Sequence, residues 1–171
     1  MKKLIKFIAL SIVLLSLAAG TFAQVADVAT VTATIVTPIT ITKTVDMNFG
    51  NAAVNATPGT ILLLPAGTRS ATGGVSFLTG NPGTVTAAEF DITGLPAATY
   101  SISITNVPVT VTDGTNNMTV DTFTRTPAGA GTLTGGGTET VFVGATLNVP
   151  ASQPAGVYAS VTPFTVTVNY N

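Results

Sequence analysis

The sequence predicts an all-β protein in which antiparallel strands form two packed layers. Thr and Val, which favour strands, are abundant after residue 24, whereas the helix-favouring residues Lys, Glu and Leu are scarce there. No stretch of ten or more residues in this region places apolar side chains at helical spacing. The candidate strands are short and are separated by turn residues such as Asn81-Pro82-Gly83 and Asp113-Gly114. This spacing is typical of a β-sandwich.

The candidate strands are recognised by alternating apolar and polar residues, and by glycine or proline near their ends. In chain order they are residues 25–35, 39–42, 45–49, 60–64, 75–78, 89–92, 100–105, 107–111, 118–123, 141–149 and 158–170, the last interrupted by Pro163. Within them, Phe90 and Ile92 are expected to face the core, as are Tyr100, Ile102 and Ile104. The glycine-rich segment between Thr126 and Thr138 is expected to be a flexible loop.

Residues 1–23 are expected to be a cleaved signal peptide. A basic start precedes an apolar run, and Thr21-Phe22-Ala23 then offers small residues at the two positions that a signal peptidase reads. The apolar run is about eleven residues, shorter than the roughly twenty that a spanning helix needs. An uncleaved anchor is the alternative. Residues 24–171 are then expected to form one exported domain without a transmembrane span, in the periplasm, at the cell surface or outside the cell.

Composition excludes several kinds of chemistry. The chain has no Cys and no His, which removes thiol chemistry, thiolate metal sites and the commonest general base. After residue 23 three basic residues, Lys43, Arg69 and Arg125, face seven acidic ones, so nucleic acid is not an expected partner. No nucleophile motif and no phosphate-binding loop is present. The sequence therefore predicts a protein without catalysis and without a cofactor or metal.

Two acidic features have some of the parts of a functional site. Glu89 and Asp91 project from the same face of one strand and are a close carboxylate pair, as a glycosidase requires, but they alternate with core residues and are interpreted as an outer face. Asp113-Gly114 lacks the acidic spacing of a calcium loop and is interpreted as a hairpin turn.

One lysine and the surface loops suggest two further possibilities. Lys43 with an Asn and either Glu89 or Asp91 would supply the parts of an intramolecular Lys–Asn bond, although nothing in the spacing demands one. The alternative function is an adhesin-like or carbohydrate-binding module that uses loops near residues 126–138. An exposed cluster containing Tyr100 or Tyr158 would favour that alternative.

The two ends of the chain resemble known bacterial proteins. Gln153-Pro-Ala-Gly-Val-Tyr158 and the final FTVTVNYN are similar to the C-termini of fimbrial (chaperone–usher pilin) subunits and spore-coat-U-like proteins. Those pilins typically have a penultimate Tyr, alternating apolar residues before it and a Gly upstream. Here Tyr170 is penultimate, and Gly156 lies fourteen residues before it. Residues 33–41 and 47–50 look like the opening of a secreted domain-of-unknown-function family with the same ending, and residues 143–149 extend the resemblance through the chain.

The resemblance implies an immunoglobulin-like (pilin-like) antiparallel β-sandwich that assembles by strand addition. In pilins one subunit donates an N-terminal strand to an open edge of the next. The expected pairing edge comprises Gly156, Phe164, Val166, Val168 and Tyr170. The candidate donor comprises Ala29, Val31, Ala33 and Ile35, within residues 25–35.

An alternative is that residues 25–42 are the domain's own first strand, which would make the domain complete. The expected function is an exported bacterial surface or fimbria-like structural protein. Its expected partners are copies of itself or other surface subunits.

Overall fold

The computed structural model describes residues 24–171, so the predicted signal peptide at residues 1–23 lies outside the described residues. Two units are distinguished, Met1–Ile35 and Val36–Asn171. In the first unit, residues 24–35, hereafter the N-terminal segment, form no strand, so the strand predicted at residues 25–35 is wrong for this single chain. Alternation alone does not define a strand, because a strand also needs a neighbour that supplies ladder hydrogen bonds.

The second unit is an antiparallel all-β domain, which confirms the prediction of an all-β protein; the immunoglobulin-like sandwich stays a prediction. It has thirteen strands and, in its described residues, no helix. In chain order the strands are β1 (Thr40–Val45), β2 (Asn48–Phe49), β3 (Ala52–Leu63), β4 (Arg69–Phe77), β5 (Val85–Thr86), β6 (Ala88–Thr93), β7 (Thr99–Thr105), β8 (Val109–Thr112), β9 (Asn117–Thr126), β10 (Gly131–Thr132), β11 (Thr138–Val149), β12 (Ala159–Ser160) and β13 (Thr165–Tyr170).

Strand β11 organises the largest sheet, because it has three partners. One edge pairs first with β6, from Thr138↔Thr93 to Val143↔Ala88, and then with β3, from Ala145↔Leu63 to Val149↔Gly59. The other edge pairs with β9. Gly144 lies where the partner changes, and a Cβ there would collide with the backbone of residues 63–65. A side chain at this position is therefore excluded by close approach of the backbone.

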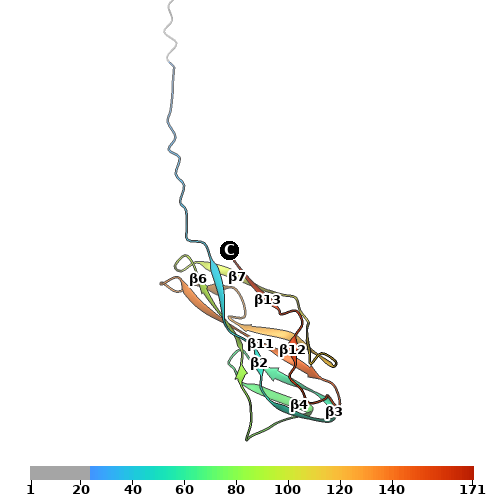
Figure 1. Cartoon of the computed structure of the whole chain (residues 1–171). Helices are drawn as coiled ribbons and strands as arrows, with labels where there is room; N and C mark the ends of the chain where they lie inside the picture. The colour runs from blue at the N-terminus through green and yellow to red at the C-terminus, as the bar shows by residue number, and fades with distance from the viewer. Residues whose placement is uncertain (1–23) are drawn as a thin grey trace, which may run out of the picture. The chain divides into compact units, whose positions relative to one another are not determined.

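The remaining strands complete the sheets. The eight-stranded sheet has the order β1-β6-β11-β9-β8-β12, and β4 is attached through β3. A second sheet has the order β10-β7-β13, and β2 pairs with β5. In Figure 1, β7 and β13 lie at the end of the domain that carries the C-terminus, whereas β3 and β4 lie at the opposite end.

Two core clusters divide the domain. The first is enclosed between two sheets and contains Ala88, Phe90, Ile92, Tyr100, Ile102, Leu133, Val141, Val143, Val166 and Val168. The second draws all its buried residues from one sheet, which must therefore curl around them: Ile61, Val75, Val109, Met118, Val120, Ala145, Leu147 and Val149. We call these regions the two-sheet half (β1, β6, β7, β10, β13 and the start of β11) and the curled half (β3, β4, β8, β9 and the end of β11).

The predicted inward residues are largely confirmed. Phe90, Ile92, Tyr100 and Ile102 are buried, and Ile104 packs against the first cluster while partly exposed. The segment 126–138 is not simply a loop, because it contains β10, which pairs with β7, and the buried Leu133. Its glycines include Gly131, where a Cβ would overlap the ring of Tyr100. Glycine there permits close packing against that ring.

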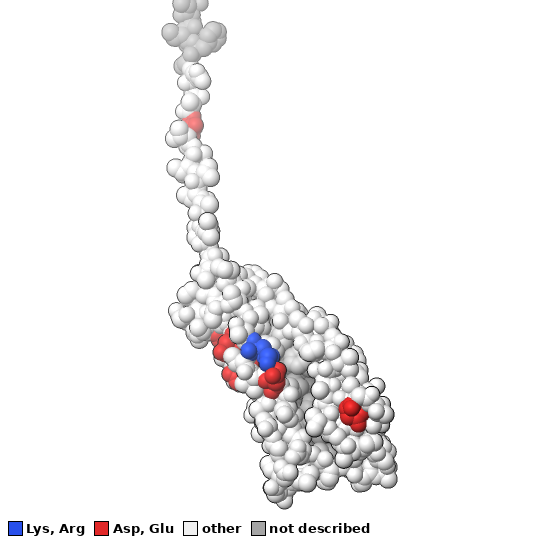
Figure 2. Space-filling model, in the orientation of Figure 1, with Lys and Arg blue, Asp and Glu red and all other residues white. Residues whose placement is uncertain are grey.

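The surface carries few charges. Figure 2 shows a largely uncharged face with one basic spot next to acidic side chains. Within residues 24–171, a single salt bridge joins Lys43 to Asp46 at 2.8 Å. Residues 24–171 contain no helix that is long and apolar enough to cross a bilayer.

Candidate functional site

Strand β13 has one edge without a partner strand. It pairs with β7 in continuous register from Thr165↔Thr105 to Tyr170↔Tyr100, and none of the strands described between residues 24 and 171 pairs with its other edge. The N–H of Asn171 donates to the carbonyl of Thr99 at 3.2 Å. Because successive residues of an antiparallel strand face opposite neighbours, the backbone groups of Val166, Val168 and Tyr170 point to the free edge.

The side chains of β13 fix it firmly to the first core cluster. Val166 and Val168 are both 8% exposed, whereas Thr165, Thr167 and Asn169 face solvent. Phe164 precedes the strand, and its ring centroid lies 4.9 Å from that of Phe123. The edge is therefore presented by a strand whose inner face is already packed.

Tyr170 connects the end of β13 to two other segments. Its hydroxyl donates to the carbonyl of Thr37 at 2.8 Å and accepts the N–H of Leu95 at 2.6 Å. Gly94 leaves the space that the hydroxyl occupies. Thr37, three residues before β1, and the turn after β6 are thus held at the C-terminal end of β13. The penultimate position of Tyr170 was the sequence signal, but it did not predict these two partners.

Two other unpaired edges, those of β1 and β4, carry features that hinder strand addition. Strand β1 has a register shift between Lys43 and Val45, and Lys43 places a charge on it. Strand β4 begins with Arg69 and contains Gly73, whose φ is +61°. Charge, bulges and irregular backbone are common protections of edges. The β13 edge has a regular register, no charged residue and no proline.

Only some residues of the predicted pairing edge lie on one strand. Val166, Val168 and Tyr170 belong to β13, and Phe164 immediately precedes it. Gly156 was placed on this edge by the sequence motif, but it lies outside any strand, beside Asp113 and Tyr158. Its contribution is to a turn packed against the β8–β9 hairpin.

The candidate donor residues Ala29, Val31, Ala33 and Ile35 are all exposed and belong to the N-terminal segment. Pro38, which has no N–H and restricts the residue before it, separates that segment from β1. In this chain the domain's first strand is therefore β1, starting at Thr40, rather than residues 25–42.

The acidic residues are placed as structural groups. Glu89 and Asp91 lie on β6, and Asp91 accepts a hydrogen bond from Thr140 at 2.8 Å. In the β8–β9 turn, the Asp113 carboxylate accepts N–H groups of Thr115 at 2.8 Å and Asn116 at 2.6 Å. These bonds, led by that from Asn116, hold the pKa of Asp113 well below its usual range. Lys43 pairs with Asp46 rather than with an Asn side chain.

The tyrosines do not form an exposed sugar-binding cluster. Tyr100 is fully buried and donates to Glu139 at 2.8 Å. Burial first, then the hydrogen bond and charge of Glu139, raise the pKa of Tyr100 well above its usual range. Tyr158 is half-buried and donates to the carbonyl of Pro154. Tyr100 is therefore not part of an exposed cluster, which is the feature that would favour a carbohydrate-binding module.

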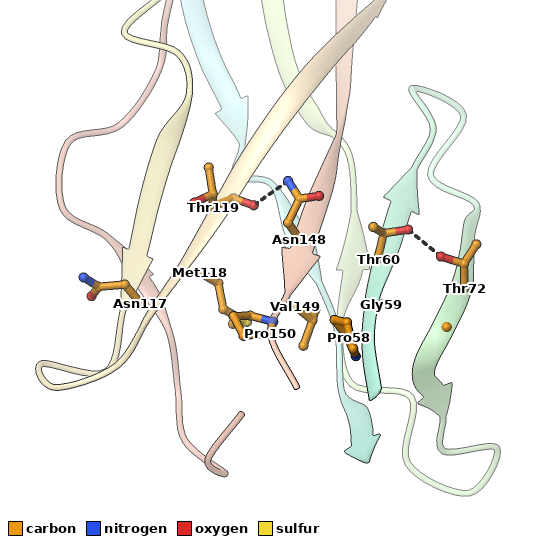
Figure 3. Close-up of a pocket in the computed structure, with 11 residues that line it drawn as sticks. Pro58, Gly59, Thr60, Thr72, Asn117, Met118, Thr119, Asn148, Val149 and Pro150 are labelled. Carbon is orange, nitrogen blue, oxygen red and sulfur yellow. Dashed lines mark hydrogen bonds between the residues drawn. The ribbon is translucent and has the colours of Figure 1, made fainter. Parts of the chain in front are cut away.

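A hollow of about 520 Å³, lined by both polar and apolar residues, lies at the end of the curled half (Figure 3). Its eleven lining residues include no charged side chain. Thr60 bonds Thr72 at 2.8 Å, and the Asn148 amide donates to the carbonyl of Thr119 at 3.3 Å. These polar groups satisfy one another, so the hollow offers no acid–base pair. No group of three or more His, Cys, Asp or Glu residues that could hold a metal occurs in the part of the chain that the structure describes.

The fold and this edge define an antiparallel all-β domain that ends in an unprotected strand. Residues 39–170 match the family described as Domain of unknown function (DUF4402), and the chain belongs to that family. The matched range covers β1 to β13 and leaves the N-terminal segment outside. No curated protein and no solved structure matched the chain. The family match does not extend to spore-coat-U-like proteins or pilins, so that resemblance stays a prediction.

Proposed function

We propose that this protein is an exported bacterial surface or fimbria-like structural protein that assembles by β-strand addition and performs no catalysis. The acceptor is the free edge of β13, and the donor is the N-terminal segment of another copy. The protein acts in the periplasm, at the cell surface or outside the cell after removal of residues 1–23.

The observation that carries this proposal is the condition of the β13 edge. A regular, uncharged strand with a free row of backbone groups is a template for another strand, and monomeric proteins usually protect such a row. Here the protections occur on β1 and β4 but not on β13. Addition of one strand would pair the free groups of Val166, Val168 and Tyr170.

The N-terminal segment has the chemistry of a donor. Val25, Val28, Val31 and Ile35 are between 92% and 98% exposed. Burial of one such side chain contributes roughly 1.5–3 kcal/mol. From residue 29 to residue 35, Ala or an aliphatic residue alternates with Thr. If this segment forms a strand, its apolar face can enter an apolar site while its Thr face stays in contact with water.

The assembly expected from this arrangement is a linear fibre. Donor and acceptor are different surfaces of the same chain, so the contact is head-to-tail and can repeat without closing. The two-sheet half is then an immunoglobulin-like module whose layers end at β1 and β13. The sparse charge supports close packing of copies, since few charges would lose water.

Size analysis of residues 24–171 and of a variant lacking residues 25–35, by chromatography with light scattering, tests the proposal. We expect concentration-dependent polymers from the first and a folded monomer from the second. A monomer from both, at any concentration tested, contradicts the proposal. Loss of the β-sheet circular-dichroism signal on deletion also contradicts it, because the segment would then be needed within its own domain.

A matched pair of point variants locates the acceptor. Thr167 lies on β13 and Ser103 lies directly opposite it on β7, and both face solvent. Thr167→Lys adds a charge to the edge strand and should abolish polymers. Ser103→Lys adds the same charge to the neighbouring strand β7, away from the free edge of β13, and should leave them. Equal effects of the two variants would place the acceptor elsewhere.

A further inference from the structure

A second hollow, of about 580 Å³, lies where β7 and β9 face each other. Its apolar lining includes Ile104, Val107, Pro108 and Phe123, and its charged lining residues are Asp121 and Arg125. The hollow is open to solvent, and its remaining lining residues are Thr119 and Thr122, so apolar side chains and polar groups that could orient a ligand lie next to each other. The hollow is distinct from the β13 edge, because it lies on the other side of β7.

An irregularity in β9 shapes this hollow. Between Asp121 and Thr124, β9 contains one residue more than the facing part of β11. Thr122 there has a φ of +49°, which β-branched residues rarely adopt. A bulge of this kind re-aims the side chains that follow it. On β7, only Thr99 and Tyr100 pair with β10, so the edge beside Ile104 is left without a strand in the described structure.

Arg125 is incompletely satisfied in this hollow. Its Nη2 donates to the carbonyl of Ile102 at 3.2 Å and, at 3.5 Å, to that of Gly129. Its Nε is buried without an acceptor, and no carboxylate of residues 24–171 forms a salt bridge with it. A buried donor without an acceptor costs free energy and calls for an explanation.

The neighbouring carboxylate is already occupied by other groups. Asp121 accepts from the Thr122 hydroxyl at 3.0 Å through Oδ1 and from the Asn148 amide at 2.9 Å through Oδ2. Its bonds hold it to β9 and β11, while the Arg125 guanidinium is left with unused donors. Planar guanidinium groups bind carboxylates with two parallel hydrogen bonds.

We propose that this hollow binds a carboxylate that carries a small branched apolar group. The carboxylate pairs with Arg125, and the apolar group packs on Ile104, Val107 and Phe123. Two sources offer this chemistry. One is a free organic acid, and the other is Asp27 of a second copy, which lies between Ala26 and Val28 in the N-terminal segment.

The experiment is a titration of ¹⁵N-labelled residues 24–171 with 3-methylbutanoate, followed by amide chemical shifts. We expect saturable shifts around Ile104 and residues 122–125, and at least tenfold weaker binding of the uncharged 3-methylbutanamide. Arg125→Gln should weaken binding at least tenfold, whereas Lys43→Gln, which removes an exposed cation, should leave it unchanged. No saturable shifts with the acid, equal binding of the amide, or equal binding by Arg125→Gln would overturn the proposal. The amide comparison uses the unaltered protein and so remains decisive if Arg125→Gln does not fold.

Peptides of residues 24–35 distinguish the two sources. If the peptide displaces 3-methylbutanoate and its Asp27→Asn form does not, the second copy supplies the carboxylate. If neither peptide displaces the acid, the site takes a free acid. The site is proposed to be independent of strand addition. Thr167→Lys should therefore block polymers but retain binding of 3-methylbutanoate.

Discussion

The two halves of the domain bury similar aliphatic side chains but enclose them differently. In the two-sheet half, β6 and β11 face β7 and β13 across the first cluster. In the curled half, a single sheet wraps the second cluster, and residues from outside it, such as Tyr158 and Phe164, pack against that cluster. Each of two separate sheets has two edge strands, whereas a sheet that curls around its own core covers more of its edges. The unprotected edge accordingly occurs in the two-sheet half.

The strongest test of this comparison is a matched pair of core truncations. Ile92 is 0% exposed in the first cluster, and Ile61 is 2% exposed in the second. Each Ile→Ala change should lower the free energy of unfolding by about 2–5 kcal/mol. Because β11 contributes to both clusters, urea unfolding of each variant should remain one transition. Two separated transitions in either variant would show that the halves unfold independently.

A methyl group at the junction should disturb both halves together. Gly144→Ala places a Cβ against the backbone of residues 63–65, where no flexible side chain can move away. We expect a loss of roughly 3 kcal/mol in the free energy of unfolding. Gly129→Ala, at a position with open space around it, is the control and should be nearly neutral. Similar stabilities of the two variants in urea would contradict the role given to Gly144.

A tyrosine in each half allows the polar interiors to be compared. Tyr100→Phe removes the buried hydroxyl that donates to Glu139 and should cost roughly 2 kcal/mol. Tyr158→Phe should cost less, because its bond to Pro154 is exposed. The raised pKa of Tyr100 adds a pH dependence. The neutral phenol is favoured in the folded state, so this stability is complete below about pH 10, the unfolded value, and is lost as pH rises above it.

Denaturation at several alkaline pH values measures this effect. The unaltered protein should lose stability above about pH 10 faster than Tyr100→Phe does. Parallel curves for the two proteins would exclude Tyr100 as the source of the alkaline loss.

The smallest effect is expected at the β8–β9 turn of the curled half. The depressed pKa of Asp113 means that its ionised form is favoured by folding. This stability is present above the unfolded value of about 4 and is lost as pH falls through the lower folded value. Asp113→Asn should therefore show a shallower acid-induced loss than the unaltered protein, measured by thermal unfolding between pH 2 and pH 5. An identical acid profile would show that other carboxylates are responsible.

Local patterns predicted much of the secondary structure. The alternation of Tyr100, Ile102 and Ile104 identified β7, and the Asp113-Gly114 signal identified the turn between β8 and β9. The full length of β3 was missed because Pro58 and several small residues interrupt its pattern. The segment around Gly131 was predicted as a loop because it is rich in glycine. In the structure Gly131 makes room for the ring of Tyr100, a contact that sequence spacing does not reveal.

The arrangement of the sheets was less accessible to prediction. Two layers were expected, but the change of partner along β11 depends on backbone approach at Gly144, which has no local signature. The apolar residues of the terminal strand were identified from alternation, whereas Gly156 was assigned by motif and lies in a turn. The unsatisfied Arg125 had no signal beyond being one of few basic residues. Its environment is created by β7 and by the bulge in β9.

The three partners of β11 also constrain the order of folding. Strands β3, β6 and β9 all precede β11 in the chain, and each must wait for the same twelve residues before its pairing is complete. Contacts between distant parts of a chain form slowly, because a long loop must close first. A chain still emerging from a ribosome thus holds its early strands without their common neighbour. The native architecture becomes available only when about the last fifth of the polypeptide, from β11 onward, arrives.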